Sequence, residues 1–217
     1  FVDASDAKNF KDAVQDNTRA FFVESLGNPK LDVLDLKAIS KESKAAGVPF
    51  VVDNTVATPT LLNPIEHGAN LVIHSLTKYI GGHGTTLGGA IVDSGKFPWE
   101  KHKEKFPMLN TPEPSYHGVV YTEAFGPAAY IGRVRTVALK NTGSALAAMS
   151  AFQLLQGLET LSLRMERHCD NAIAVAEYLE NHEKVSWVRF GGLKSSEYYS
   201  LANKYCGGKP AAILSFG

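Results

Sequence analysis

The most constraining feature of this sequence is a short apolar run that ends in a carboxylate. Residues 50–53 are apolar up to the last one, Asp53, after which a loop begins. A strand that is apolar on both faces is typical of a parallel sheet with helices on both sides. Further apolar runs at residues 20–24, 70–74 and 90–92 alternate with helical patterns. We therefore predict an α/β fold in which a mostly parallel sheet has flanking helices.

The second half of the chain carries a long helical pattern and then changes character. One face of the later helix is predicted to consist of Leu161, Met165, Cys169, Ala172, Ala176 and Leu179. An apolar strand follows at residues 186–190. We therefore divide the chain into residues 1–143, the central part of a large domain whose N-terminal part is missing, residues 144–184, which are connecting helices, and residues 185–217, the truncated start of a smaller α+β C-terminal domain.

Composition argues against several classes of function. The chain has 217 residues, with 22 Lys and Arg against 22 Asp and Glu, so its formal net charge is zero. It therefore lacks the basic excess that attracts nucleic acids and anionic membranes. Its two cysteines, Cys169 and Cys206, and its seven histidines show no metal-ligand spacing. Because the sequence also shows no export signal, we expect a cytoplasmic protein that binds no metal, nucleic acid or membrane.

Four polar residues are predicted to meet at one edge of the sheet. Asp53 ends one strand, and Ser75, Thr77 and Lys78 follow the run at residues 70–74. If these strands are parallel neighbours, their carboxyl ends lie about 5 Å apart. Ligands of open α/β sheets bind at that edge, so the four residues form a candidate cofactor site.

These residue types match the chemistry of pyridoxal 5′-phosphate (PLP). The amine of Lys78 is suited to a Schiff base with the cofactor aldehyde, and the carboxylate of Asp53 is suited to keeping the pyridine nitrogen protonated. Ser75 and Thr77 supply hydroxyl groups for a phosphate, and nearby glycines let the backbone approach it. Asn28, which follows the strand at 20–24, is placed to bond the phenolic oxygen of the cofactor or a substrate carboxylate.

Each of these residues also has an ordinary structural interpretation. Asp53 alone is more often a turn cap, and Lys78 alone is more often a solvated lysine. It is the joint pattern that favours a cofactor site.

Two glycine-containing segments could suggest a nucleotide site instead. The segments 82–84 and 94–97, however, lack the glycine spacing of dinucleotide and P-loop motifs.

Three further polar residues lie near this pattern or on the later helix. His83 is a secondary candidate because it is close to the lysine in sequence. Arg164 and His168 are read as a solvated or inter-domain face of the later helix.

The run from Ser75 to His83 resembles the S-x-T-K-Y-x-x-G-H run of the fold-type I PLP enzymes of Cys/Met metabolism. Within that family the chain is most similar to the O-acetylhomoserine sulfhydrylases, whose runs are echoed at residues 52–55, 81–86 and 93–99. The resemblance covers essentially the whole chain. It includes the segment 97–121, which is similar to the insertion that distinguishes sulfhydrylases from cystathionine synthases and lyases.

The resemblance implies a role for each candidate residue. Lys78 would be the Schiff-base lysine, Asp53 the partner of the pyridine nitrogen, Ser75 and Thr77 phosphate ligands, and Asn28 a residue near the cofactor oxygen. The family also uses an N-terminal phosphate loop, a ring-stacking tyrosine and a C-terminal carboxylate-binding arginine, none of which is present here. We therefore expect the chain to be an internal piece of a protein of roughly 400 residues, which is likewise suggested by ends that read as interrupted strands.

The implied reaction is γ-replacement, in which O-acetyl-L-homoserine and sulfide give L-homocysteine and acetate. The resemblance also implies a homotetramer built from active dimers. Related alternatives are a methionine γ-lyase, which would admit water in place of sulfide, and a cystathionine γ-synthase. More distant alternatives are a nicotinamide-dependent oxidoreductase, disfavoured by the missing glycine motif, and a non-enzymatic assembly or binding domain.

Overall fold

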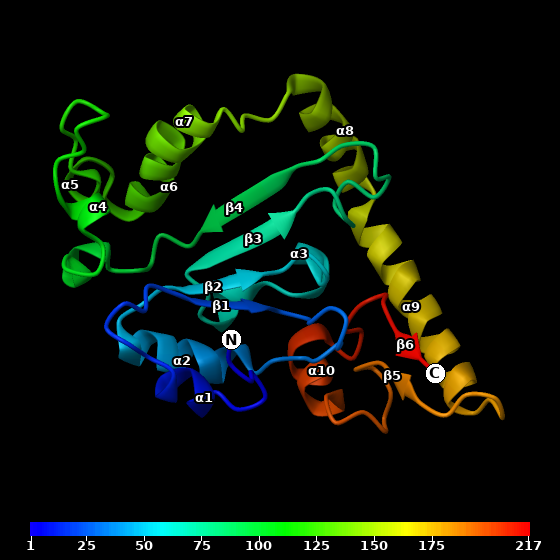
Figure 1. The fold of residues 1–217 in the computed structure, drawn as a ribbon. Coiled ribbons are helices and arrows are strands. Elements are labelled where there is room, and N and C mark those ends of the chain that lie inside the picture. Colours follow the sequence, from blue (N-terminus) through cyan, green and yellow to red (C-terminus); the bar gives the residue numbers. More distant parts are fainter.

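A four-stranded sheet forms the centre of the computed structural model, which describes all residues from 1 to 217 (Figure 1). The strands are β1 (Phe21–Glu24), β2 (Phe50–Asp53), β3 (Leu71–Ser75) and β4 (Gly89–Asp93), in the order β1-β2-β3-β4. β1, β2 and β3 are parallel, and β4 is antiparallel to β3. The predicted mostly parallel sheet is thus confirmed, with one antiparallel strand at its edge.

Helices on one side of the sheet supply most of the core. α1 (Lys8–Asp12) packs beside α2 (Leu36–Ala46), and both lie below the sheet in Figure 1. The carboxylate of Asp35 caps the start of α2 by accepting from Ala38 N, and Gly47 ends the helix in the left-handed conformation that glycine tolerates. Leu36 and Ile39 share one buried cluster with Phe50 and Val52 of β2. β2 is therefore as deeply buried as its apolar run indicates.

The short elements between the strands are α3 (Thr58–Leu61) and the 3₁₀ turn η1 (Pro64–His67). After β4 the chain forms η2 (Trp99–His102), α4 (Pro107–Asn110), α5 (Tyr121–Phe125), η3 (Gly126–Ala128), α6 (Ala129–Arg133), η4 (Val134–Leu139) and α7 (Lys140–Thr142). These elements share a small core of Phe97, Trp99, Phe106, Leu109, Tyr121 and Ala129. The segment 97–121 is thus an ordered excursion, held together largely by its buried aromatic residues.

Two long helices, α8 (Ala148–Glu159) and α9 (Leu161–Glu180), run along the side of the sheet at which the parallel strands end (Figure 1). The predicted apolar face of α9 is buried at Leu161, Met165, Cys169, Ala172 and Ala176. This stripe packs against both the sheet end and the residues that follow the helix, so α9 connects the two parts of the chain.

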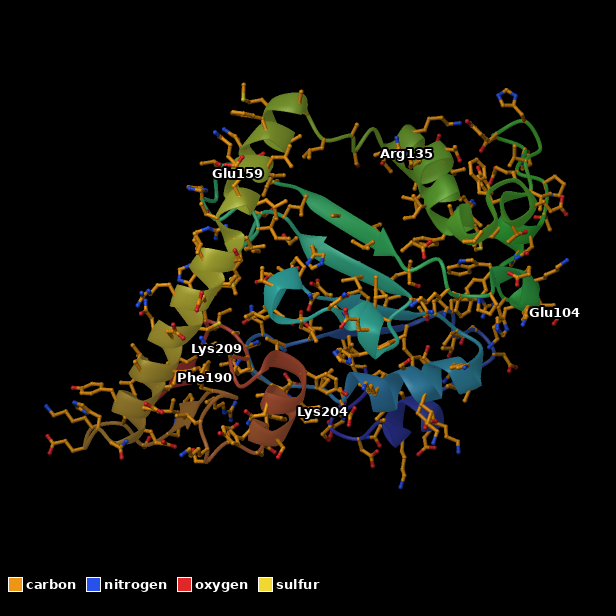
Figure 2. The ribbon with its side chains drawn as sticks, turned by 180° about the vertical axis from the view of Figure 1, so that it is seen from behind. Glu104, Arg135, Glu159, Phe190, Lys204 and Lys209 are labelled. Carbon is orange, nitrogen blue, oxygen red and sulfur yellow. The ribbon has the colours of Figure 1, made fainter.

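The C-terminal segment contains β5 (Val188–Arg189), α10 (Tyr199–Cys206) and β6 (Ser215–Phe216), and the two strands pair antiparallel. Figure 2 shows Phe190 and Lys209 beside the C-terminal half of α9, and Lys204 on α10. α10 contributes to the same core cluster as β2, and the hydroxyl of Tyr205 donates to Asp35 at the start of α2. The division at residue 185 remains a prediction from the sequence.

Several large apolar side chains are exposed, notably along α8 and at the outer strands. Met149, Phe152 and Leu155 of α8 are 54–67% exposed, and Phe22 of β1 is 57% exposed. No helix in the structure is both long enough and apolar enough to span a lipid bilayer.

Candidate functional site

A pocket of about 610 Å³ lies where the parallel strands end. The strand ends and their following turns supply one wall of the lining and α9 supplies the other, and Ile213 also lines the pocket. Figure 1 shows α9 running beside the ends of the parallel strands. The structure brings all five residues singled out from the sequence to this pocket: Asn28, Asp53, Ser75, Thr77 and Lys78. The volume falls within the range of small-molecule and cofactor sites.

Asp53 is placed by the register of the sheet. It pairs with Glu24 of β1 and Ile73 of β3, so it stands at the carboxyl end of the central parallel strand. Its Oδ1 accepts a hydrogen bond from Thr55 N at 2.9 Å, which is the turn cap. Its Oδ2 has no partner within the chain. One oxygen of the Asp53 carboxylate therefore caps the turn, and the other is free to bond a ligand.

A buried polar network beneath the pocket fixes the loop that follows Asp53. Asn54 is fully buried and donates from Nδ2 to Thr58 O at 3.0 Å and to Leu62 O at 2.8 Å. Its Oδ1 accepts from the hydroxyl of Ser25 at 2.7 Å, which joins the ends of β1 and β2. Because every polar atom of this amide is bonded, burial carries little desolvation penalty. The sequence places Asn54 only at the start of a loop, and no local pattern marks this buried role.

Lys78 is presented by a tight turn after β3. Its backbone N donates to Ser75 O at 3.3 Å, and its carbonyl accepts from Gly82 N at 2.8 Å. Ser75 N donates to Thr55 Oγ1 at 2.8 Å, which ties this turn to the loop after Asp53. The Lys78 side chain is exposed to the pocket and has no hydrogen-bond partner in the protein. Its amine is thus available to a ligand.

The two predicted phosphate ligands, Ser75 and Thr77, differ in whether their hydroxyl groups already have a hydrogen-bond partner in the protein. The Ser75 hydroxyl has no partner in the chain. The Thr77 hydroxyl accepts from Gly88 N at 3.1 Å and lies 3.4 Å from Gly88 O, so it also fastens the end of the glycine-rich segment. Thr77 therefore has a structural contact in addition to its place in the pocket.

The glycines after Lys78 allow close packing of the turn against α8. A Cβ on Gly157 of α8 would lie 2.1 Å from Gly81 O, and one on Gly81 would lie 2.9 Å from a methyl of Leu154. Both distances are too short for a side chain, so glycine is required at this contact. From the sequence, the glycines near Lys78 are expected to let the backbone approach a phosphate; in the structure, Gly81 instead allows close packing against α8.

α9 contributes Arg164 and His168 to the pocket. The sequence places Arg164 on a solvated or inter-domain face; in the structure its guanidinium is turned onto the lysine turn of the 1–143 segment and donates to Tyr79 O at 2.8 Å. His168 is exposed, and its ring centroid lies 5.8 Å from that of Tyr79. His83 does not line the pocket; its Nδ1 lies 2.7 Å from Gly81 O.

The pocket carries charges of both signs, from Glu24, Asp53, Lys78 and Arg164. Burial raises the pKa of Tyr79 above its usual value, so the phenol stays neutral at physiological pH. The side chains contain no group of three or more His, Cys, Asp or Glu residues arranged to hold a metal ion. The site therefore offers an amine, carboxylates and hydroxyls to an organic ligand.

Comparison with known proteins identifies a family of enzymes to which the chain is similar. The family model described as Cys/Met metabolism PLP-dependent enzyme matches residues 1–217. The chain is 51% identical to a homocysteine synthase of Schizosaccharomyces pombe, over 100% of the chain and 51% of that protein. It is 50% identical to an O-acetyl-L-homoserine sulfhydrylase of Leptospira meyeri, over 94% of the chain and 48% of that protein. The chain thus spans about half the length of these relatives.

Solved structures show the same fold. A crystal structure of a putative O-acetylhomoserine (thiol)-lyase from Campylobacter jejuni, which contains a pyridoxyl-lysine phosphate residue, matches 99% of the chain and 52% of its own with a TM-score of 0.94 and 38% identity. An O-acetylhomoserine sulfhydrylase of Wolinella succinogenes matches with a TM-score of 0.86 and 34% identity, over 100% of the chain and 57% of its own. The chain therefore belongs to the Cys/Met metabolism family of PLP-dependent enzymes and has their fold-type I architecture.

Proposed function

We propose that the protein catalyses γ-replacement, in which O-acetyl-L-homoserine and sulfide give L-homocysteine and acetate. The observation that carries the proposal is the convergence of Asp53, Ser75, Thr77 and Lys78 on one pocket at the carboxyl edge of the sheet. The names of the relatives, which include homocysteine synthase and O-acetyl-L-homoserine sulfhydrylase, support this choice of reaction within the family.

The residues present fit PLP. The cofactor requires an amine for its aldehyde, an acid partner for its ring nitrogen and hydrogen-bond donors for its phosphate. Lys78 supplies an unpaired amine, Asp53 an Oδ2 with no partner in the chain, and Ser75 an unpaired hydroxyl, all facing one pocket. Thr77 adds a second hydroxyl two residues on, and Asn28 lines the pocket from the loop after β1, where we expect it to bond a cofactor or substrate oxygen.

Bound PLP supplies an electron-accepting ring that stabilises negative charge on the substrate carbon skeleton. In our proposal the Asp53 carboxylate holds a proton on the ring nitrogen. Lys78 Nζ would hold the cofactor covalently before substrate arrives and would be released by the substrate amine. It would then take the proton from Cα, pass it to C4′ of the cofactor and so be free to take a second proton from Cβ. Acetate would leave from Cγ with the electrons of its C–O bond, hydrosulfide would form the new C–S bond at that carbon, and Lys78 would return protons to Cβ and Cα.

The related alternatives differ in the nucleophile. A γ-lyase would admit water where a sulfhydrylase admits sulfide, and a cystathionine γ-synthase would use the thiol of cysteine. Product analysis of the purified natural protein with O-acetylhomoserine distinguishes them. Homocysteine that forms only when sulfide is added supports our proposal. A 2-oxo acid and ammonia formed at equal rates with and without sulfide would assign a lyase, and cystathionine formed with cysteine would assign the synthase.

We further propose that the protein works in the cytoplasm as a homotetramer of active dimers. We also retain the division into residues 1–143, 144–184 and 185–217. The exposed apolar residues of α8 and β1 support additional packing partners. Light scattering of the natural protein gives the oligomeric state, and limited proteolysis that cleaves near residue 185 would support the domain boundary.

A further inference from the structure

We infer that Arg164 is a positioning residue that holds the turn carrying Lys78 in place, an inference that rests on the proposed role of Lys78. Arg164 lies on the first turn of α9, just after the junction with α8 marked by Glu159 in Figure 2. Its task is to hold backbone carbonyls, which is different from binding an acidic group: no carboxylate lies within ion-pair distance of it.

The hydrogen bonds of Arg164 connect three segments of the chain. Nη1 donates to Tyr79 O at 2.8 Å and Nη2 to Ile80 O at 3.3 Å, the two carbonyls that follow Lys78. Nη2 also donates to Gly157 O at 2.7 Å, near the end of α8. Nε donates to Thr160 Oγ1 at 3.1 Å, at the helix junction. Thus one guanidinium bonds the lysine turn to both helices.

Glycine residues make room for this contact. A Cβ on Gly82 would lie 2.7 Å from Arg164 Nη1, and Gly82 has a φ of +74°, where a side chain is strained. A Cβ on Gly157 would meet Gly81 O at 2.1 Å. The backbone of the lysine turn therefore lies directly against α8. The guanidinium of Arg164 fills the space that a side chain at Gly82 would occupy.

The geometry explains why an arginine is needed. Its planar group presents donors in fixed directions, and here they reach four acceptors at once. The ammonium of a lysine would reach fewer of them. Because Tyr79 and Ile80 directly follow Lys78, loss of these bonds frees the backbone that aims the Lys78 amine. Small displacements of a catalytic group have large effects on rate.

The test compares Arg164→Met and Arg164→Lys with Arg167→Met, a matched control on an exposed position of the same helix with no side-chain bond. The first readout is amide hydrogen exchange in the cofactor-free natural protein. We expect exchange at Gly81 and Gly82, whose amides donate to Leu76 O and Lys78 O, to rise about tenfold or more in Arg164→Met. Arg164→Lys should show a smaller rise, and Arg167→Met none.

The second readout is specific to the lysine. Cofactor-free protein is mixed with pyridoxal phosphate, reduced with borohydride and mapped by mass spectrometry. We expect the share of label on Lys78 to fall about tenfold in Arg164→Met, and kcat of the reloaded enzyme to fall more than KM rises. If Arg164→Met does not fold, Arg164→Lys carries both readouts, because it keeps a positive charge at the site and still loses part of the hydrogen bonding.

Unchanged exchange at Gly81 and Gly82, or unchanged labelling of Lys78, would overturn the inference. A rise in KM alone would also overturn it, since that result would make Arg164 a substrate contact. A wild-type protein labelled on a different lysine would instead contradict the proposed function, and the exchange data would still report on the hydrogen bonds of Arg164. The two failures are therefore distinguishable.

Discussion

The two walls of the pocket are built differently. On the sheet wall, Asp53 Oδ2, the Ser75 hydroxyl and the Lys78 amine have no partner in the chain. Strand pairing fixes the backbones of Asp53 and Ser75, and a tight turn fixes that of Lys78. On the helix wall, Arg164 directs its donors to backbone carbonyls and leaves little for a ligand. The sheet wall therefore supplies reactive groups, and the helix wall supplies their position. Substitutions on the two walls should have different consequences.

The largest effect is expected at Lys78. Lys78→Ala removes both the covalent anchor of the cofactor and the group that moves protons, so turnover should fall by about 10³-fold or more. Steady-state kinetics of the natural protein measure this, with Lys96→Ala as a control at an exposed lysine without a side-chain bond. A Lys78→Ala enzyme within about tenfold of wild type would place the chemistry outside the sheet wall.

Asp53→Asn distinguishes the role of Asp53 as a turn cap from the proposed role of its negative charge. Asn also accepts a hydrogen bond from Thr55 N, so the turn should survive and the free energy of unfolding should change by less than about 0.5 kcal/mol. Turnover should nevertheless fall by about 10²-fold, because an amide does not hold a proton on the pyridine nitrogen as a carboxylate does. Near-normal turnover, with cofactor binding retained, would reduce Asp53 to a turn cap.

Asn54→Ala tests the support beneath the sheet wall. It leaves the Ser25 hydroxyl and Leu62 O without a buried partner and removes one of the two hydrogen bonds to Thr58 O, which should lower the free energy of unfolding by about 3 kcal/mol. Asn63→Ala, at an exposed amide, should cost less than about 0.5 kcal/mol. Urea denaturation measures both. Equal losses in the two variants would show that the network contributes little to the stability of the wall.

The smallest effect is expected at Thr77. Thr77→Val keeps the shape but loses the hydroxyl that bonds Gly88, so PLP affinity should fall roughly tenfold, while Thr77→Ser should bind normally. Thr85→Val, on an exposed residue of the same glycine-rich segment, is the control. Cofactor titration followed by absorbance gives the affinities. Unaltered binding by Thr77→Val would remove Thr77 from the phosphate ligands.

The sheet wall was more accessible to sequence reasoning than the helix wall. The strand 50–53 is apolar to its last residue, and the structure places β2 over those residues. Parallel pairing of β2 and β3 then brings Asp53 and the turn after β3 to one edge of the sheet, independently of the conformation of the connecting loops. The fold class was confirmed for the same reason, since short-range apolar patterns largely determine which strands are buried.

Arg164 and Asn54 could not be recognised in this way. Arg164 donates to carbonyls that are 84 and 85 residues away in the chain. Those hydrogen bonds depend on how α9 lies along the ends of the parallel strands. Asn54 is a buried amide in a loop, and loop amides are usually solvated. The apolar C-terminal run 211–217 has a strand-like sequence, yet only Ser215–Phe216 forms a strand, because its partner β5 has two residues. Tertiary contacts determine the roles of Arg164 and Asn54 and the length of the C-terminal strand, and such contacts are not visible in local sequence patterns.

The central claim is that the sheet wall holds PLP through Lys78. The direct measurement is borohydride reduction of the natural protein as purified, followed by proteolysis and mass spectrometry. Our account predicts an absorbance band of the bound cofactor that is lost on reduction, and a pyridoxyl-phosphate mass on Lys78 alone. A label on another lysine, or a protein that binds no PLP when the cofactor is supplied in excess, would contradict it.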